Sequence, residues 1–163
     1  MKTIHLIRHG KSSWDDYQLT DMERPLKQRG IKDCEIMAPY IAQVGCKFTH
    51  TFVSPARRAE QTMELLADHL DTPVSWQIDE RLYTFDCGEV LAWLRDIDND
   101  IDEVVVVGHN PALTDLHNLL TGECLYNLPT CGYLQLQSSA KKWQQLKPKS
   151  SECLHFIKPK QFK

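Results

Sequence analysis

Three apolar runs in this chain each end in a polar motif that leads into a helical pattern. Residues 104–107 are four consecutive valines, which is typical of a strand buried on both faces of a parallel sheet. Residues 3–7 and 50–53 are further short runs of this kind. Strands that alternate with helices predict an α/β fold, in which a mostly parallel sheet is covered by helices on both faces.

Apolar residues recur at helical spacing after each expected strand, so we expect four strand–helix units in a single domain covering residues 1–163. A chain of this length can bury one good core and is too short for two ordinary domains. The tail favours short strands or a hairpin with antiparallel character. The expected strands are residues 3–8, 49–53, 74–78 and 103–108, followed in the tail by 133–137, 142–146 and 153–158; the helical patterns cover 31–42, 56–70, 90–97 and 113–120.

The triplet Arg8-His9-Gly10 follows the first strand directly and is suited to chemistry on a phosphate. Neutral imidazole is a good nucleophile near neutral pH, but a phosphate monoester repels attackers unless cations hold its oxygens. Arg8 supplies such a cation, with a planar fork that matches phosphate oxygens. Because Gly10 has no side chain where the backbone turns, we expect an oxyanion to approach main-chain N–H groups there.

Two further motifs lie at expected strand ends. Residues 54–62 read Ser-Pro-Ala-Arg-Arg-Ala-Glu-Gln-Thr and place two arginines in the first turn of a helix. Since a helix N-terminus attracts anions and disfavours cations, this pattern indicates a bound phosphate. The valine run ends in Gly108-His109-Asn110-Pro111, which adds a second histidine. Ligands of open α/β sheets bind beyond the carboxyl ends of the strands, where all three motifs are expected.

With these three ordered motifs the chain resembles the histidine phosphatase superfamily, also called the RHG or phosphoglycerate-mutase-like superfamily, over at least residues 3–111. The resemblance implies a phosphoglycerate-mutase-like three-layer sandwich. It implies that His9 is the nucleophile that becomes phosphorylated and that Arg8 and Arg58 hold the phosphate. His109 would be the second histidine that contacts the phosphate. Arg57 precedes the family arginine by one position and receives no role.

The general acid is less well defined. Residues 79–83, Asp-Glu-Arg-Leu-Tyr, resemble the Glu-Arg-x-Tyr segment of the mutase branch, whose glutamate is the proton donor. We therefore expect Glu80 to be catalytic, with Asp86 as a weaker candidate. The glycine-rich continuation of the mutases is replaced by Thr-Phe-Asp-Cys-Gly at residues 84–88. The chain has no obvious insertion to serve as a lid against water, so hydrolysis is expected rather than transfer to a second hydroxyl.

In length, and in residues 21–26 together with Gly30, the chain resembles the short bacterial phosphohistidine phosphatases. Lys27 stands where that branch usually has threonine, which we expect to affect a helix cap more than the chemistry. The resemblance implies a phosphatase that forms a phosphohistidine intermediate and hydrolyses phosphohistidine on a protein. Two alternatives stay open: a phosphatase or mutase of a small phosphorylated metabolite, and a non-catalytic phosphate-binding protein.

Composition and charge limit the classes of partner that we expect this chain to bind. The formal net charge of −3 comes from dispersed charges without a basic stripe, which argues against nucleic acid, and no apolar segment is long enough for a membrane span. Met1-Lys2 leads straight into the first strand without a signal-peptide pattern, so we expect a cytoplasmic protein. The expected partner is a phosphorylated protein, such as a phosphohistidine carrier, or a small phosphate ester. We expect no metal and no cofactor, because the two arginines and His109 would neutralise the phosphoryl oxygens.

The remaining polar residues are interpreted as structural or solvated. The six cysteines are irregularly spaced, and we expect small apolar thiols without disulfides or zinc. Trp14 is assigned to ordinary packing, although it lies near the nucleophile in sequence. The lysines of the tail are interpreted as soluble surface, together with Lys141 and Lys142. Surface positions are expected for His5, His50, His69, His117 and His155.

Overall fold

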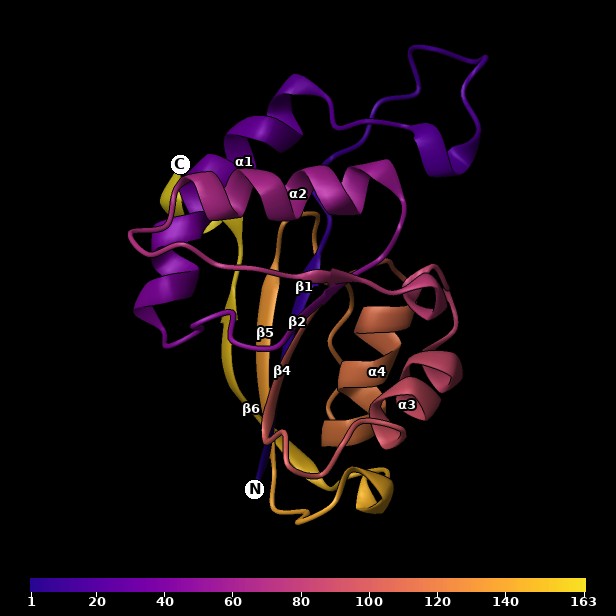
Figure 1. Ribbon diagram of the computed structural model, residues 1–163, viewed down its shortest axis with the longest axis vertical. Coiled ribbons are helices and arrows are strands. Elements are labelled where there is room, and N and C mark those ends of the chain that lie inside the picture. Colours follow the sequence, from indigo (N-terminus) through magenta and orange to yellow (C-terminus); the bar gives the residue numbers. More distant parts are fainter.

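The computed structural model describes residues 1–163 and is built on a six-stranded sheet with strand order β3-β2-β4-β1-β5-β6 (Figure 1). Strands β1 to β4 are mutually parallel, whereas β5 and β6 run antiparallel to their neighbours. The strands are β1 (Lys2–Arg8), β2 (Thr51–Val53), β3 (Gln77–Ile78), β4 (Glu103–Gly108), β5 (Tyr133–Ser138) and β6 (Ser151–Ile157); the α-helices are α1 (Gln28–Gln43), α2 (Arg57–Asp68), α3 (Cys87–Arg95) and α4 (Ala112–Thr121); the 3-10 helices are η1 (Asp21–Glu23), η2 (Glu80–Leu82), η3 (Trp143–Gln145) and η4 (Pro159–Phe162).

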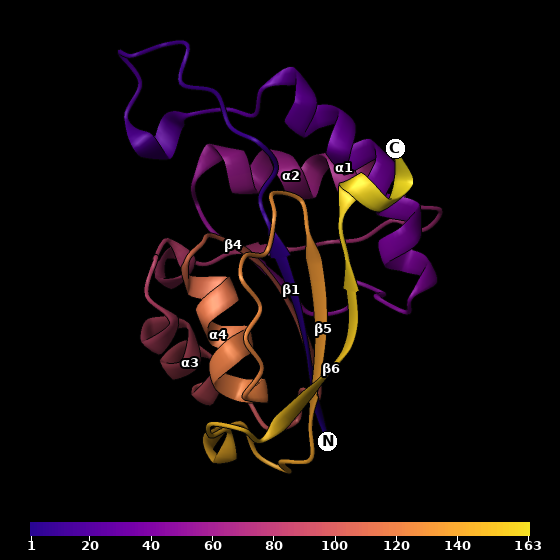
Figure 2. The same ribbon diagram turned by 180° about the vertical axis from the view of Figure 1, so that it is seen from behind.

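Helices cover both faces of the sheet, and the side-chain alternation of the central strands explains why. Ile4 and Leu6 of β1 pack in the cluster that contains α3 and α4, whereas Ile7 packs with α1 and α2. The valines of β4 divide between the two clusters in the same alternating way. Successive side chains of a strand point to opposite faces, so a strand that is apolar throughout requires a layer on each side. The expected α/β sandwich is confirmed, with α3 and α4 on one face and α1 and α2 on the other (Figure 2).

The register of the parallel strands brings distant segments together at one edge. Arg8 pairs with Gly108, and Val53 pairs with Val107, so β1, β2 and β4 end at nearly the same level. The residues that follow these strands, including His9 and His109, therefore leave the sheet side by side. Ligand sites of open parallel sheets are found at this edge.

The tail departs from the sequence expectation at one element. Residues 142–146 were expected to form a strand, but Trp143–Gln145 is the 3-10 helix η3. The Trp143 side chain is fully buried, and its indole N–H donates to the carbonyl oxygen of Ile101 at 2.8 Å. The segment is also held by Leu146, which is buried, and by the Trp143 amide, which donates to Asn99 Oδ1 at 2.8 Å.

Two glycines allow the start of α1 to approach the loop after β1. A Cβ on Gly30 would lie 2.4 Å from the carbonyl oxygen of Lys11, which no real Cβ tolerates. A Cβ on Gly10 would lie 3.1 Å from the carbonyl oxygen of Gly30, so both positions are constrained by the same backbone contact. Lys27 is the N-cap of α1 and makes no side-chain capping hydrogen bond, as expected for a lysine at this position.

Two histidines that were expected at the surface are buried. His5 is 0% exposed because β1 is a central strand, and His117 is 2% exposed because it lies on the inner face of α4. All six cysteines are free thiols. No helix combines the length and the apolar character that a membrane crossing requires.

Candidate active site

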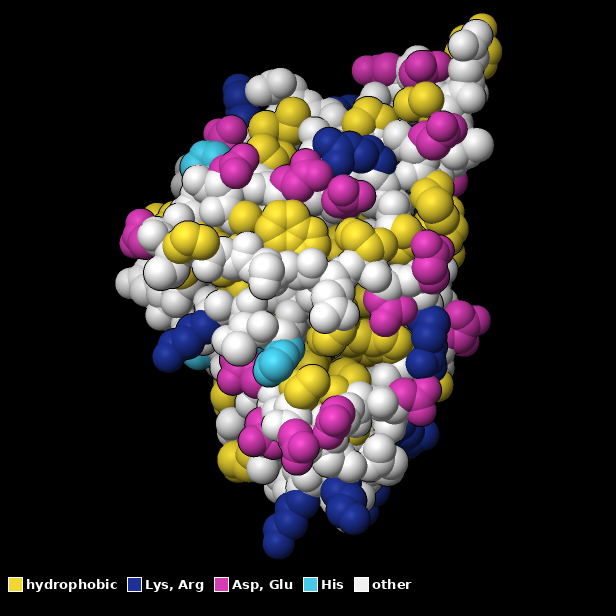
Figure 3. Space-filling view, in the orientation of Figure 1, with side chains coloured by type: hydrophobic (Ala, Val, Ile, Leu, Met, Phe, Trp, Pro, Cys, Tyr) yellow, Lys and Arg dark blue, Asp and Glu magenta, His cyan; other side chains and the backbone are white.

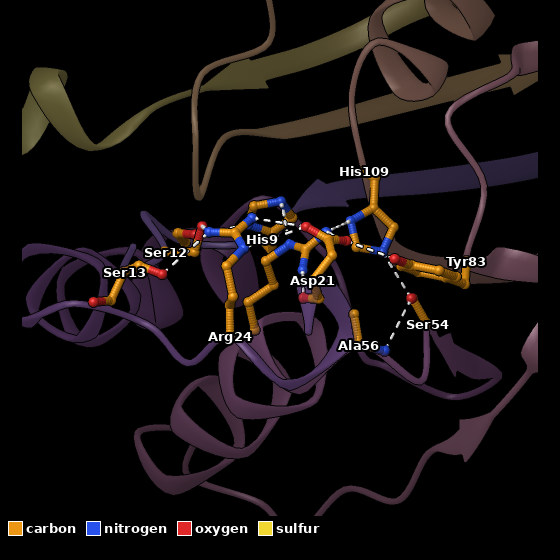
Figure 4. A network of polar contacts seen from close by, with 11 residues as sticks. His9, Ser12, Ser13, Asp21, Arg24, Ser54, Ala56, Tyr83 and His109 are labelled. Carbon is orange, nitrogen blue, oxygen red and sulfur yellow. Dashed lines mark hydrogen bonds and ion pairs between the residues drawn. The ribbon is translucent and has the colours of Figure 1, made fainter. Parts of the chain in front are cut away.

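His9 lies immediately after β1 and is only 8% exposed (Figure 4). Its Nδ1 is 2.7 Å from the carbonyl oxygen of Gly10. Because a carbonyl oxygen only accepts hydrogen bonds, Nδ1 carries the proton and Nε2 carries the lone pair. Arg58 Nε donates toward that lone pair at 3.4 Å. The unprotonated nitrogen of His9 is thus held next to a guanidinium.

Arg58 occupies the first turn of α2 and is 2% exposed. Its guanidinium joins the two histidines, since Nε faces His9 and Nη2 lies 3.4 Å from Nδ1 of His109. The neighbouring Arg57 points elsewhere and pairs with Glu64 at 3.0 Å. Consecutive residues of a helix lie on different faces, which is why only one of these two arginines reaches the histidines.

His109 follows β4 and is oriented by Ser54, which follows β2. The Nε2 of His109 lies 2.7 Å from Ser54 Oγ. Arg58 donates to the other ring nitrogen, so Nδ1 accepts and Nε2–H donates to the serine. Ser54 Oγ also accepts a hydrogen bond from the amide of Ala56 at 3.3 Å. The rings of His109 and His9 lie 5.2 Å apart between centroids, and both point into the same site (Figure 4).

Arg8 is the last residue of β1, and it is fastened to the loop before β5. Its Nη1 donates to the carbonyl oxygen of Leu128 at 2.9 Å, while its buried Nε has no hydrogen-bond acceptor. Burial lowers the pKa of Arg8 from its ordinary value. Arg8 is therefore a partly buried cation next to His9 in the chain, and its buried Nε–H remains free for a further acceptor.

The electrostatics of the cluster keep both histidines neutral. Burial lowers the pKa of His9 to about 4; the hydrogen bond to Gly10 opposes this shift, and the nearby arginines reinforce it. Burial also lowers the pKa of His109 to about 3, with His9 and Arg58 acting in the same direction. Transfer of a charged imidazole into a buried site costs free energy, and adjacent cations add to that cost.

Asp21 was not singled out from the sequence, yet it is the main acidic contact of the cluster. Its Oδ2 accepts a hydrogen bond from Arg58 Nη2 at 3.0 Å and from the Tyr83 hydroxyl at 2.5 Å. Its Oδ1 accepts from Nε and Nη2 of Arg24, each at 3.2 Å. Partial burial raises the pKa of Asp21, but hydrogen bonds from Tyr83 and Arg58 outweigh it and lower the pKa to about 2. This carboxylate is therefore ionised and orients two arginines.

Arg24 is a further cation that the sequence analysis left without a role. It is 6% exposed, and its Nη1 donates to Ser12 Oγ at 2.7 Å. Trp14, expected to pack in the ordinary way, is 72% exposed and covers the Arg24 guanidinium at 3.5 Å from the ring centroid. The residues lie in an irregular loop with no periodic pattern, so the sequence carried no signal beyond the resemblance of residues 21–26.

Three residues that were expected to take part in this site, Gly10, Glu80 and Asp86, do not contact the histidines or arginines through the expected groups. Main-chain N–H groups at the Gly10 turn were expected to face an oxyanion, but the N–H of Gly10 itself donates to Thr62 Oγ1 at 2.9 Å, and the glycine allows the close approach to α1. Glu80 is exposed and makes no hydrogen bond or ion pair with the histidines or arginines. Asp86 is the N-cap of α3 and accepts from the Gly88 N–H at 3.3 Å. No group of three or more His, Cys, Asp or Glu is arranged to hold a metal ion.

Comparison with known proteins places this geometry in a family. The family model of the histidine phosphatase superfamily (branch 1) matches residues 4–92. The phosphohistidine phosphatase SixA of Escherichia coli strain K12 is 32% identical over 110 residues, covering 66% of this chain and 67% of its own.

Solved structures agree with this match. A structure of the protein histidine phosphatase SixA complexed with tungstate has a TM-score of 0.81 at 26% identity and covers 99% of both chains. A mycobacterial glucosyl-3-phosphoglycerate phosphatase shares the fold, with a TM-score of 0.64 at 13% identity over 94% of this chain and 97% of its own. The chain therefore belongs to the histidine phosphatase superfamily, in its branch of short bacterial phosphohistidine phosphatases.

Proposed function

We propose that this phosphatase hydrolyses phosphohistidine on a protein substrate and that His9 carries the phosphoryl group between the two half-reactions. One observation carries the proposal: the Nε2 lone pair of a buried, neutral His9 faces Arg58, while the Nδ1 proton is held by the Gly10 carbonyl. An imidazole with a pKa near 4 keeps its lone pair throughout the physiological range.

In the first half-reaction, His9 Nε2 attacks phosphorus in line with the leaving group. A P–N bond to His9 forms as the P–N bond to the substrate imidazole breaks, and the departing ring nitrogen takes a proton from solvent. In the second half-reaction, water attacks the phosphohistidine and returns a proton to solvent, His9 leaves with its lone pair restored, and inorganic phosphate departs. No redox step is involved.

Arg8, Arg58 and His109 are the residues that we assign to the phosphoryl oxygens. The guanidinium of Arg58 lies beside the attacking nitrogen, where negative charge gathers in the transition state, and the Nε of Arg8 has no acceptor within the protein. We propose that these cations perform the electrostatic role of a metal ion in other phosphoryl-transfer sites, so that turnover continues in the presence of a chelator.

A phosphoramidate substrate suits this site because no neutral carboxylic acid is held next to His9. Asp21 is ionised by its neighbours, and Asp86 caps a helix. An alkoxide leaving group needs a strong proton donor, whereas an imidazole with an ordinary pKa of about 6.5 departs with less help. Glu80 stays a prediction for the general acid, tested by Glu80→Gln against Asp86→Asn on an alkyl phosphate ester. Only the true donor should matter more as the leaving group becomes more basic.

The deciding experiment incubates the purified protein, with chelator present, with a phosphohistidine-bearing protein and with a small phosphate ester such as glucosyl-3-phosphoglycerate. We expect fast release of phosphate from the phosphohistidine protein and slow release from the ester. The opposite ranking would assign the site to small phosphorylated metabolites. No turnover of either substrate, with both still bound, would indicate a non-catalytic phosphate-binding protein.

A further inference from the structure

The lysines of the tail gather around a cavity of about 400 Å³ that lies outside the His9 cluster. We call it the basic cavity, because its lining includes four cations, Arg29, Lys158, Lys160 and Lys163, and one carboxylate, Asp33. From the sequence alone, these lysines are expected to form ordinary soluble surface. Their convergence on an arginine of α1 appears only in the folded chain, where η4 lies beside α1 (Figure 2).

Specific contacts hold the tail at this position. Phe162 stacks on Tyr40 of α1 with 3.7 Å between ring centroids, and Pro159 is buried. Lys163 Nζ pairs with Asp33 at 2.8 Å, and Arg29 Nε approaches the same carboxylate at 3.8 Å. Because Asp33 is buried and occupied by two cations, it leaves Lys158 and Lys160 without an acidic partner among these residues. The basic cavity therefore has a local positive charge in a chain whose formal net charge is −3.

The basic cavity and the His9 cluster share a wall. Pro129 and Thr130 line the cavity. In the same loop, the carbonyl oxygen of Leu128 accepts a hydrogen bond from Arg8, and the amide of Cys131 donates to the carbonyl oxygens of Arg8 and His9. Residues 128–131 therefore contact the His9 cluster and line the cavity within one short loop, so both sites lie within reach of one protein substrate.

We propose that the basic cavity docks an acidic surface segment next to the phosphohistidine of the protein substrate. This inference rests on the proposed function. It specifies in addition that the protein substrate carries negative charge beside its phosphohistidine. Opposite charges across an interface guide encounter and select the partner. Tyr126, which lines the same cavity and is 99% exposed, has the amphipathic character of side chains enriched in protein interfaces.

The chemistry of the lining favours a protein segment over one small anion. Three of the four cations are lysines, whose ammonium groups are strongly hydrated point charges on flexible stems. Such groups can meet several separated carboxylates, whereas tight capture of a single compact anion is better served by planar arginine forks and buried donors.

A peptide experiment tests the proposal directly. The probes are three substrates: a histidine-phosphorylated peptide with a flanking run of glutamates, the same peptide with glutamines, and phosphoimidazole, which is too small to reach the cavity. We expect the wild-type protein to show a kcat/KM about tenfold higher for the glutamate peptide than for the glutamine peptide, mainly through KM, and to lose this preference at high salt. Lys158→Glu combined with Lys160→Glu should abolish the preference, and the pair of Lys→Gln changes should reduce it.

The matched control is Lys141→Glu combined with Lys142→Glu, which makes the same change in net charge on exposed residues beside η3. This control should keep the preference for the glutamate peptide. Equal kcat/KM for the two peptides, a preference that survives the Lys158 and Lys160 changes, or loss of the preference in the control would each overturn the proposal.

Binding without turnover separates this proposal from the proposed function. Fluorescence anisotropy of the unphosphorylated glutamate peptide should give a Kd that rises about tenfold in the Lys158→Glu, Lys160→Glu protein. That result would support docking even if phosphohistidine were not hydrolysed. No measurable binding of the glutamate peptide, together with binding of inorganic pyrophosphate that requires Lys158 and Lys160, would overturn it in favour of a small-anion site.

Discussion

Strand β1 leads to two buried histidines with opposite surroundings. His5 lies within the strand and is hydrogen-bonded at both ring nitrogens, to Glu103 and to Tyr133, each at 2.6 Å. His9 lies just beyond the strand end and has only one nitrogen tied to a fixed acceptor, while the other faces Arg58. Burial lowers the pKa of both; Glu103 opposes this at His5, but the arginines reinforce it at His9.

The comparison teaches that burial alone does not distinguish a structural histidine from a nucleophile. A carboxylate that is hydrogen-bonded to a ring nitrogen, as Glu103 is to His5, favours the charged form of the imidazole. A guanidinium partner disfavours the charged form and so keeps the ring neutral, with one nitrogen unprotonated. The sign of the neighbouring charge therefore distinguishes the surroundings of His5 from those of His9.

The largest effect expected from this comparison is that of His9→Ala, which removes the proposed nucleophile. We expect kcat to fall by about 10⁴-fold or more, because the side chain proposed to form the covalent intermediate is lost. Trapping with labelled substrate should show an acid-labile phosphoenzyme in the wild-type protein and none in the variant. Turnover at the original rate would assign the nucleophile elsewhere.

The next largest effect on kcat is expected at Arg58, whose guanidinium faces His9. Arg58→Ala should lower kcat by roughly 10²- to 10³-fold, by analogy with loss of one transition-state donor. Arg57→Ala is the matched control, because Arg57 precedes it in the same helical turn but pairs with Glu64 at the surface. Equal losses in the two variants would show that the effect comes from helix α2 and not from phosphate stabilisation.

On the structural side, His5→Leu should destabilise the fold by about 1–3 kcal/mol, because it leaves the Tyr133 hydroxyl and the Glu103 carboxylate without their partner. Denaturant unfolding measures this, with exposed His50→Ala as a control expected to stay within about 0.5 kcal/mol of wild type. The value of kcat should remain within about twofold. A large loss of activity with unchanged stability would contradict the structural role of His5.

The last prediction concerns the dependence of stability on pH. The pKa of His9 is lowered to about 4, below its value in the unfolded chain, so the unfolded chain binds the proton first as pH falls. Stability is therefore highest above about pH 6.5 and decreases from there toward pH 4, by roughly 1.4 kcal/mol per pH unit for this group. The imidazole ¹⁵N shifts of His9 should stay those of a neutral ring down to pH 5. His9→Gln should give a shallower dependence of stability on pH, and an equal slope would contradict the lowered pKa.

The charged side chains on the molecular surface are dispersed, as the sequence without a basic stripe predicts. On the face drawn in Figure 3, acidic and basic side chains are interspersed and form no continuous basic surface. The concentration of positive charge at the basic cavity is local, and it arises because α1, the loop before β5 and the tail meet there.

The sequence by itself determined the layered α/β fold and the three motifs at the strand ends. The valine run of β4 requires cover on both faces, and parallel strands present their carboxyl ends at one edge. Such periodicity is a local property of the chain, so it can be read without knowing which segments meet. The family motif also predicted that Arg58, and not the neighbouring Arg57, is the arginine that belongs to the site.

Only the tertiary structure decided the charges around those motifs. Asp21 and Arg24 belong to the short 3-10 helix η1 and its C-cap, whose position depends on contacts with α2 and Tyr83, so no local periodicity predicted their role. His5 is buried because β1 is central in the sheet, and the tail lysines gather because η4 packs on α1. Each of these contacts joins segments far apart in the chain, and the electrostatic field at a histidine is the sum of such contacts rather than a property of its neighbours in sequence.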